Sequence, residues 1–386
     1  MNPIRQKAHE IREDVIAFRR DLHMYPELSM QEFRTSDQVA SMLDKLGIPN
    51  RRIDPTGVVG EIRGRAPGKC VALRADMDAL QITEIADSDF KSRNEGKMHA
   101  CGHDAHTAML MGAAMLLNNM KDEFDGSVRL LFQPGEENGR GAKAIIAQGG
   151  YDGVDAVFGQ HIQPNAPVGR IGAAVGAAYS ACDYFRLTVK GVTCHGSMPH
   201  DGRDATVCAS AIVMALQAMV SREFNQLEPL VVSVGTMHSG TIWNGISGEA
   251  VLEGTCRSFS DEIHDQLPKV FERVCAQTAA AYGCQVEVQW ENRMSMLIND
   301  DEMREMGLAA ARKVAGPELV GADKPTAGAE DFAEYVKRAP GAYFSLGVGG
   351  TAPLHNAGLY VDEEALEIGV AFLTQTALDA LEKLNR

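Results

Sequence analysis

The strongest constraint on the fold of this chain is a set of short apolar runs that are followed by acidic or imidazole side chains. Each run has the length and the apolar, partly β-branched composition of a buried strand. The runs and the side chains after them are residues 128–132 with Glu136 and Glu137, residues 156–159 with His161, and residues 342–348 with His355. Open α/β sheets gather their functional groups at the carboxyl ends of the strands. We therefore expect these side chains to meet at one edge of a mostly parallel sheet.

The segment at residues 99–106 adds two groups that bind metals well. Cys101 and His103 are two residues apart, so on an extended loop both can reach one ion, or each can reach one of a close pair. A thiolate and an imidazole together suit zinc and its transition-metal neighbours. The apolar run at residues 107–120 predicts a helix with Asp104 as its N-cap. The two ligands would then lie on a tight turn at the start of a helix.

Glu136 and Glu137 are adjacent in the sequence, just past a predicted strand end. Two neighbouring carboxylates at such a place cost free energy unless other groups pair with them. A metal ion on one, with a proton or a water molecule on the other, would remove that cost. The pair therefore predicts a metal ligand beside an acid–base group.

Five motifs follow one another along the chain: Arg74-Ala-Asp76-Met-Asp78-Ala, His99-Ala-Cys101-Gly-His103-Asp104-Ala-His106, Gln133-Pro-Gly-Glu136-Glu137, Gly159-Gln-His161 and Gly328-Ala-Glu330-Asp331-Phe332. Each is weak alone, but in this order they resemble the motifs of the M20 metallopeptidase family. They fit its amidohydrolase branch, which includes aminoacylases, hippurate hydrolases and auxin-conjugate hydrolases. The resemblance extends from Arg20 to beyond His355, which is essentially the whole chain.

The resemblance implies a reaction and its cofactors. The reaction is hydrolysis of the amide bond of an N-acyl amino acid, with an acetyl, benzoyl or similar acyl group, to a carboxylate and a free amino acid. Two divalent metal ions per subunit, of manganese, zinc, cobalt or nickel, would be held by Cys101, His103, Glu137, His161 and His355. Two ions about 3.5–4 Å apart can share a water molecule and lower its pKa. Glu136 then matches the general base, and Asp78 matches the carboxylate that orients a ligand imidazole.

Three residues from the middle of the chain match groups that bind the substrate. By the resemblance, His195 donates a hydrogen bond to the oxyanion, usually from the lid of the partner subunit. Asn244 and Arg257 grip the substrate carboxylate, a task that suits a planar guanidinium. The alternative for Arg257 is an ordinary ion pair on a strand surface.

The chain departs from the usual family sequence at three places beside the site. These are Gln81 after the aspartate pair, Gly245 and Ser247 after Asn244, and Ala357 and Gly358 after His355. None of them removes a ligand. They leave the acyl group and the amino-acid preference open.

We expect an α/β fold, with a mostly parallel-sheet catalytic domain that is interrupted by a second domain. The catalytic domain would comprise residues 1–181 and 293–386, and the lid or dimerisation domain residues 182–292. The insert shows the order strand, helix, two strands, helix, strand, which is typical of a ferredoxin-like α+β domain. In the first part, residues 58–63 and 69–74 are expected to be paired strands.

Composition excludes several kinds of partner. The net charge of −15 argues against nucleic acid or an anionic membrane, and no apolar run is expected to reach the length of a membrane span. Eight cysteines are scattered without paired spacing, and the charged N-terminal residues do not form a secretory signal. We therefore expect a cytoplasmic enzyme with reduced thiols and a small-molecule substrate. The strand edges of the insert and the family resemblance both predict a homodimer or a higher homo-oligomer.

Two other functions are compatible with this fold and these ligands. A dinuclear dipeptidase or aminopeptidase needs an extra carboxylate for the substrate ammonium group, and the sequence offers no clear candidate. A catalytically silent metal-binding protein would not need Glu136 beside five ligands. Residues 139–144 formally match a dinucleotide-binding motif, but they do not directly follow a strand and are expected to begin a helix.

Overall fold

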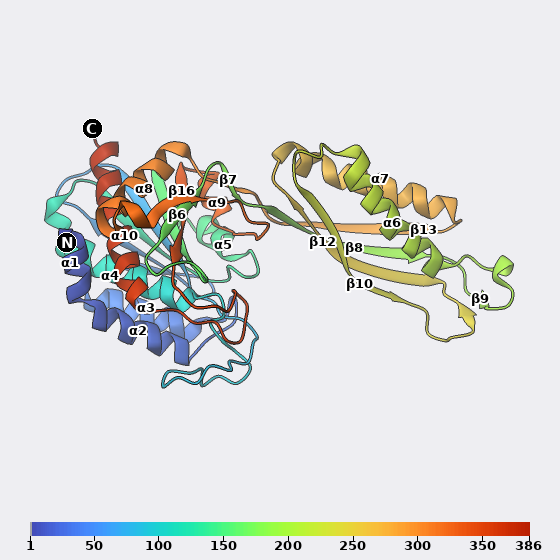
Figure 1. Cartoon of the computed structure of the whole chain (residues 1–386), viewed down its shortest axis with the longest axis horizontal. Helices are drawn as coiled ribbons and strands as arrows, with labels where there is room; N and C mark the ends of the chain where they lie inside the picture. The colour runs from blue at the N-terminus through green and yellow to red at the C-terminus, as the bar shows by residue number, and fades with distance from the viewer. Residues whose placement is uncertain (1) are drawn as a thin grey trace. The chain divides into compact units, whose positions relative to one another are not determined.

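The computed structural model describes residues 2–386 and divides the chain into two compact units (Figure 1). Unit 1 consists of Met1–Ala178, Ile298–Pro325 and Asp331–Arg386, and unit 2 of Tyr179–Leu297 and Thr326–Glu330. The short strands β7 (Ala177–Tyr179) and β14 (Leu297–Ile298) carry the chain from one unit to the other. The segment Thr326–Glu330 was not assigned to the insert by the sequence prediction.

Unit 1 is built on an eight-stranded sheet. Its order is β1 (Asn50–Ile53), β2 (Gly57–Arg63), β4 (Ser127–Gln133), β3 (Cys70–Asp76), β5 (Ala156–Gln163), β16 (Gly341–Gly347), β6 (Ile171–Ala174) and β15 (Val320–Asp323). The four central strands β4, β3, β5 and β16 are parallel to their neighbours within this group, and antiparallel pairs occur toward the edges. The predicted α/β fold with a mostly parallel sheet is confirmed.

The predicted pairing of residues 58–63 with 69–74 is wrong. β4 lies between β2 and β3, antiparallel to the first and parallel to the second. The connection after β2 does not close a hairpin, because its backbone bonds to the segment before β4: Gly64 N donates to Gly126 O and Arg65 N to Phe124 O. The two strands therefore neighbour the same third strand.

Helices cover both faces of this sheet. One face carries α1 (Pro3–Glu10), α2 (Arg12–Met24), α3 (Phe33–Lys45), α4 (His103–Asn119), α8 (Asp301–Ala315) and α10 (Glu364–Leu384), and the other carries α5 (Gly141–Ala147) and α9 (Ala333–Val336). The helix α4 packs against β3, α2 and α10, and nearly all of its residues are buried. The residues 139–144 lead into α5, as expected from the sequence.

The helix α4 begins differently from the prediction. Its N-cap is Gly102, which adopts a left-handed φ of 82°, and not Asp104. The buried Asp104 carboxylate lies in the first turn, where it accepts from Arg19 Nε at 2.7 Å and lies 2.8 Å from His23 Nδ1. Because Arg19 and His23 engage the Asp104 carboxylate, this side chain does not cap the helix.

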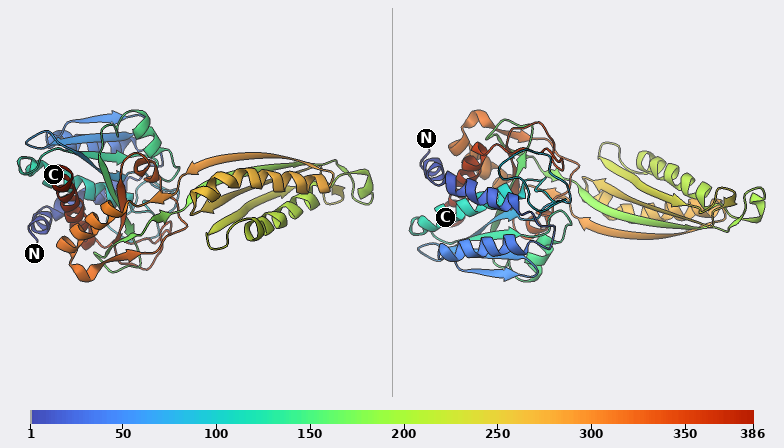
Figure 2. Two further views of the ribbon diagram at one scale, coloured as in Figure 1. Left: turned by 90° about the horizontal axis from the view of Figure 1, so that it is seen from above. Right: turned by 90° about the horizontal axis from the view of Figure 1, so that it is seen from below.

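Unit 2 has the predicted ferredoxin-like order of elements. It contains β8 (Ala181–Lys190), α6 (Ala205–Glu223), β10 (Leu230–Ser239), β12 (Glu249–Ser258), α7 (Asp261–Ala281) and β13 (Gln285–Met294). The antiparallel sheet has the order β10-β12-β8-β13, and both helices cover the same face of it (Figure 2). A small ladder of β9 (Cys194–His195) and β11 (Gly245–Ile246) extends from the same unit.

One helix overturns the expectation about apolar length. By length and composition alone, α6 is long and apolar enough to cross a membrane, and it is the one such helix among the described residues 2–386. Its buried side chains, including Cys208, Ile212 and Leu216, belong to the core of unit 2. One face of the helix is thus used to cover the sheet.

Candidate active site

The five predicted metal ligands all lie in unit 1, and the structure brings them together. They form two overlapping triplets, Cys101 with His103 and His161, and Cys101 with Glu137 and His355. Within each triplet the candidate ligand atoms lie within 4.8 Å of one another. Cys101 belongs to both triplets, so its thiolate could serve two neighbouring ions.

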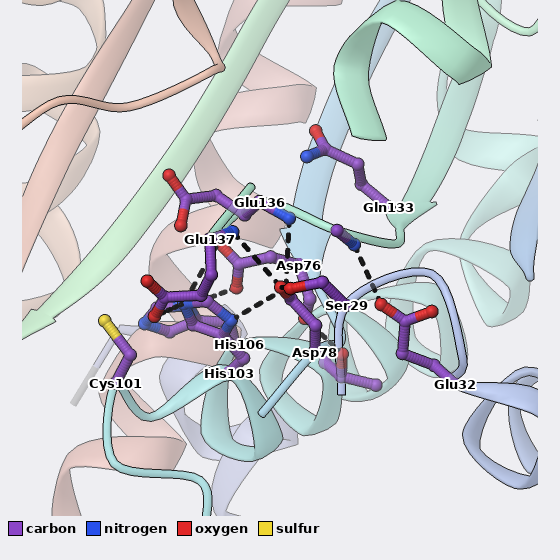
Figure 3. Close-up of polar contacts among 12 residues, drawn as sticks. Ser29, Glu32, Asp76, Asp78, Cys101, His103, His106, Gln133, Glu136 and Glu137 are labelled. Atoms are coloured by element: carbon purple, nitrogen blue, oxygen red, sulfur yellow. Dashed lines mark hydrogen bonds and ion pairs between the residues drawn. The ribbon is translucent and has the colours of Figure 1, made fainter. Parts of the chain in front are cut away.

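Asp78 connects two parts of this cluster (Figure 3). Its Oδ1 accepts from Glu136 N at 3.1 Å and lies 3.2 Å from His103 Nδ1. Its Oδ2 accepts from Glu137 N at 3.1 Å and from Ser29 Oγ at 2.6 Å. Burial raises the pKa of Asp78, but the His103 and Ser29 hydrogen bonds outweigh it, so the pKa is lowered overall. One ionised carboxylate therefore holds both the His103 ring and the turn that carries Glu136 and Glu137.

The turn after β4 is supported by the N-terminal segment of the chain. Gly135 adopts a left-handed φ of 55°, and a side chain there would collide with Met30 Sδ. The buried Glu32 accepts from Gly135 N at 2.8 Å and from Met30 N at 2.9 Å. Burial, followed by the charge of Asp78, raises the pKa of Glu32 to about 7. Ser29 and Glu32 were not predicted as site residues, because their contacts span about fifty and one hundred positions of sequence.

Hydrogen bonds decide which nitrogen of each buried imidazole faces the cluster. A carbonyl or carboxylate oxygen only accepts, so the ring nitrogen beside it carries the proton. His161 Nδ1 lies 2.8 Å from Ile162 O, which leaves its Nε2 unprotonated, 3.4 Å from Cys101 Sγ. His103 Nδ1 faces Asp78, and its buried Nε2 has no hydrogen-bond partner within residues 2–386. Both rings can therefore present a lone pair to a cation.

The charges around these lone pairs also fit a cation. His103 Nε2 lies 3.9 Å from Glu137 Oε1 and 3.8 Å from Asp76 Oδ2. Burial lowers the pKa of His103, but Asp76, Cys101 and Asp78 together raise it well above its usual value. Without a metal this raised pKa favours a protonated His103, and a metal ion bound there would displace the proton, because a ligand imidazole must be neutral. The donor set of thiolate, imidazole and carboxylate suits zinc and its transition-metal neighbours.

His355 completes the second triplet from a strained backbone. Its φ is 60°, in the left-handed region, and its N–H donates to Ala100 O at 2.8 Å. Its Nε2 lies 3.3 Å from Glu137 Oε1, and half of the side chain is exposed. Hydrogen bonds with Cys101 and Glu137 raise the pKa of His355 to about 10. Backbone strain at a residue whose side chain is half exposed is typical of functional positions.

A second buried network lies behind the ligands. Arg74 is 1% exposed and contacts Asp76 at 2.6 Å, Asp331 at 2.9 Å and Gln133 at 2.9 Å. Asp76, whose role the sequence left uncertain, also lies 2.6 Å from His106 Nδ1. His106 belongs to the motif at residues 99–106, but the sequence predicted no role for it. Its spacing of three residues from His103 on one helix was the signal that both rings would lie on the same face.

The three predicted substrate-binding residues lie in unit 2. His195 is exposed on β9, and Asn244 adjoins it, because Gly245 pairs with His195 and Gly196 N donates to Asn244 O. Arg257 lies near the far end of β12, opposite Cys182 of β8. The ladder between β8 and β12 separates it from the β9–β11 end by most of a strand, roughly 25 Å at about 3.3 Å per residue. Within a single copy of unit 2, Asn244 and Arg257 therefore lie far apart.

Comparison with known proteins identifies relatives over the full length of the chain. The family model of peptidase family M20/M25/M40 matches residues 72–379. An N-acetyl-L-cysteine deacetylase of Bacillus subtilis is 39% identical over 382 residues, covering 99% of this chain and 91% of the relative. Thermostable carboxypeptidase 1 of Saccharolobus solfataricus is 39% identical over 376 residues, covering 95% of each chain.

A solved structure agrees with both the fold and the family. The YXEP protein of Bacillus subtilis, described as a dinuclear metal binding peptidase from the M20 family, superimposes with a TM-score of 0.86. The sequences are 36% identical, and the match covers 97% of this chain and 99% of that protein.

Proposed function

Since the chain belongs to peptidase family M20/M25/M40, we propose that it is a metal-dependent amidohydrolase that splits N-acyl amino acids into a carboxylate and a free amino acid. The observation that carries this proposal is the cluster of five ligand side chains, in which the buried Nε2 of His103 has no hydrogen-bond partner within residues 2–386. The N-acyl-amino-acid hydrolase predicted from the sequence agrees with the name of the Bacillus deacetylase.

We assign two divalent ions to the two triplets, in which Cys101, His103, Glu137, His161 and His355 would hold them. When bound, such ions polarise the amide carbonyl and lower the pKa of a water molecule. The ions are manganese, zinc, cobalt or nickel, and the dinuclear description of the YXEP protein supports the number. The eight free cysteines of the chain support a reducing, cytoplasmic setting.

Glu136 is the proposed general base. It is 6% exposed, and the same Asp78 carboxylate that orients His103 holds its backbone. In this role it takes a proton from the attacking water and passes it to the amine that leaves. This role requires Glu136 to lie beside a metal ligand, Glu137, but does not require Glu136 to bind the metal itself.

Arg257 and Asn244 are the proposed contacts of the substrate carboxylate, and His195 that of the oxyanion. The names of two relatives agree with a carboxylate contact. N-acetyl-L-cysteine carries a free carboxylate, and a carboxypeptidase cleaves at the carboxyl end of a peptide. Since Arg257 lies near the carboxyl end of β12 and Asn244 in the loop before its other end, a single unit 2 does not present both to one carboxylate. A homodimer in which one chain supplies Arg257 and the other Asn244 and His195 removes this difficulty.

The second candidate function is cleavage of peptides at the carboxyl end, favoured by the relative named as a carboxypeptidase. In chemical terms a peptide is an N-acyl amino acid whose acyl group carries further residues. The two functions therefore differ in the acyl group and share the carboxylate. An aminopeptidase or dipeptidase, by contrast, must recognise a free amino group near the scissile bond.

The test is a substrate panel with defined metals. Metal-free protein is loaded with manganese, cobalt, nickel or zinc, and metal content is measured together with hydrolysis of N-acetyl, N-benzoyl and peptidyl amino acids. Each is compared with a carboxamide analogue and with a free dipeptide. We expect turnover of the N-acyl and peptidyl amino acids with a free carboxyl group, and little turnover of their carboxamides or of the free dipeptide. Metal binding without turnover would identify a silent binding protein, and preference for the free dipeptide would identify a dipeptidase.

The dimer is tested by mixing two inactive proteins. Glu136→Ala and His195→Ala variants are exchanged into heterodimers, each of which has one intact site if His195 serves the partner subunit. With random exchange, about a quarter of wild-type activity should return. If His195 serves its own chain, every site lacks one group and no activity returns.

A further inference from the structure

The strands β3 and β5 separate just where the ligands begin. Their parallel register runs from Val71 with Ala156 to Arg74 with Gly159 and stops there. Beyond that point, the ring of His106 bridges the two strands. Its Nδ1 lies 2.6 Å from Asp76 Oδ1 at the end of β3, and its Nε2 accepts from Ile162 N of β5 at 2.9 Å. The side chain thus takes the place of the backbone ladder.

These two contacts fix the protonation of His106. A backbone N–H can only donate, so Nε2 of His106 carries no proton, and Nδ1 carries it and donates to Asp76. His106 is therefore a neutral imidazole with both nitrogens engaged. Asp76, His103 and His106 lie close enough to hold a metal ion, but His106 has no lone pair left for one. The buried ring is built into the protein frame and is not a ligand.

The residue that His106 holds is the neighbour of a proposed ligand. Ile162 receives the His106 contact on its N–H, and its carbonyl accepts from His161 Nδ1 at 2.8 Å. The rings of His106 and His161 also touch edge to face, with centroids 4.6 Å apart. The side chain of Ile162 packs directly against Gly102, just before the helix, where a side chain on residue 102 would collide with it. His106 therefore acts on His161 in two ways, through the backbone of Ile162 and through the direct ring contact.

We propose that His106 is a positioning residue that holds the separated ends of β3 and β5 so that His161 Nε2 faces Cys101. The inference rests on the proposed function, because it concerns the affinity of the ion bound by Cys101, His103 and His161. It assigns His106 no contact with substrate or metal. It predicts that the ion of the other triplet is little affected by changes at His106.

The first test is metal affinity, measured by competition with a chelating dye for both ions. His106→Phe keeps a ring but loses both hydrogen bonds, and it should weaken one ion about 10- to 100-fold and leave the other unchanged. His106→Gln, whose carbonyl can still accept from Ile162 N, should restore part of that loss. The matched control is Thr107→Val, which removes the equally buried bond to Asp76 O and should change neither affinity.

The second test reads the imidazole directly by NMR of protein labelled with nitrogen-15 at histidine. His106 should appear as the neutral Nδ1–H form, with and without metal. Affinities in the His106 variants equal to wild type would overturn the inference while leaving the proposed function intact. Loss of the Nδ1–H signal on metal addition would also overturn it, since His106 would then be a ligand. If wild-type protein binds no divalent ion, the proposed function fails, and the NMR signal still shows whether the bridge exists.

Discussion

His103 Nδ1 lies 3.2 Å from Asp78 Oδ1, and this one contact determines which nitrogen of the ring faces the cluster. The two residues are 25 positions apart, just after the end of β3 and at the start of α4. A carboxylate in this position increases the basicity of the distal nitrogen and holds the ring in one orientation. We therefore infer that Asp78 orients a proposed metal ligand and is not a ligand itself.

Asp78→Asn should lower metal affinity and activity together. Both oxygens of Asp78 accept backbone N–H groups, from Glu136 and Glu137, so an amide NH₂ in place of either oxygen would face a donor. We expect about a 10- to 100-fold loss of metal affinity, measured by chelator competition. Ser29→Ala removes a donor to the same carboxylate and leaves its charge, so it should cost much less. Equal losses in the two variants would contradict the role of the charge.

Glu136→Gln should separate metal binding from catalysis. The amide keeps the size of the side chain but does not accept a proton, so kcat should fall about 10²- to 10⁴-fold. Metal content should stay at the wild-type level, because Glu136 is not in either proposed triplet. Steady-state kinetics and metal analysis on the same preparation check both points. A normal kcat would remove Glu136 from the mechanism.

Arg257→Ala should raise KM for free acids and reduce the preference for them over carboxamides. The guanidinium of Arg257 can bind both oxygens of a substrate carboxylate, whereas a neutral carboxamide offers one acceptor oxygen and no charge. Arg186→Ala is the matched control, because Arg186 lies on β8 in the same sheet and pairs with Glu253 at 2.8 Å. Kinetics with one substrate as acid and as amide decide the point. Equal losses on both substrates would leave Arg257 as an ordinary strand arginine.

Glu32 should make stability depend on pH in an unusual direction. Burial and Asp78 raise the pKa of Glu32 from 4.5 to about 7, so the folded protein binds this proton more tightly than the unfolded chain. Stability should therefore fall as pH rises from about 4.5 to about 7, by on the order of 3 kcal/mol. Glu32→Gln should lack this part of the slope. Denaturant unfolding of both proteins across the range measures it, and parallel profiles would contradict the assignment.

The sequence predicted the members of the cluster because each follows a strand or begins a helix. His161 lies near the carboxyl end of β5 and His355 follows β16, and parallel neighbouring strands end at the same edge. The ferredoxin-like order of unit 2 was likewise readable from the alternation of strands and helices. These features depend on residues that are close together in the sequence, so they can be predicted from it.

The contacts that orient the cluster were not predictable in the same way. Asp104 was expected to cap α4, but Arg19 and His23, more than 80 positions earlier, bind its carboxylate instead. The bridge by His106 exists only because β3 and β5 separate, and strand separation is a property of the assembled sheet. The insertion of β4 between β2 and β3 has the same origin. Partners that are far apart in sequence compete for a side chain, and local spacing does not reveal which one wins.

The interruption of unit 1 by unit 2 sets the order in which the protein can be completed during synthesis. Unit 2 draws its core from one continuous stretch, Tyr179–Leu297, whereas α4 is covered in part by α10 at the far end of the chain. When residue 297 has left the ribosome, the core of unit 2 can close while the apolar surface of α4 still lacks that cover. His355 and α10 are then still to be made. The proposed metal centre is therefore expected to be one of the last features to form, and a truncated chain should expose apolar surface and lack activity.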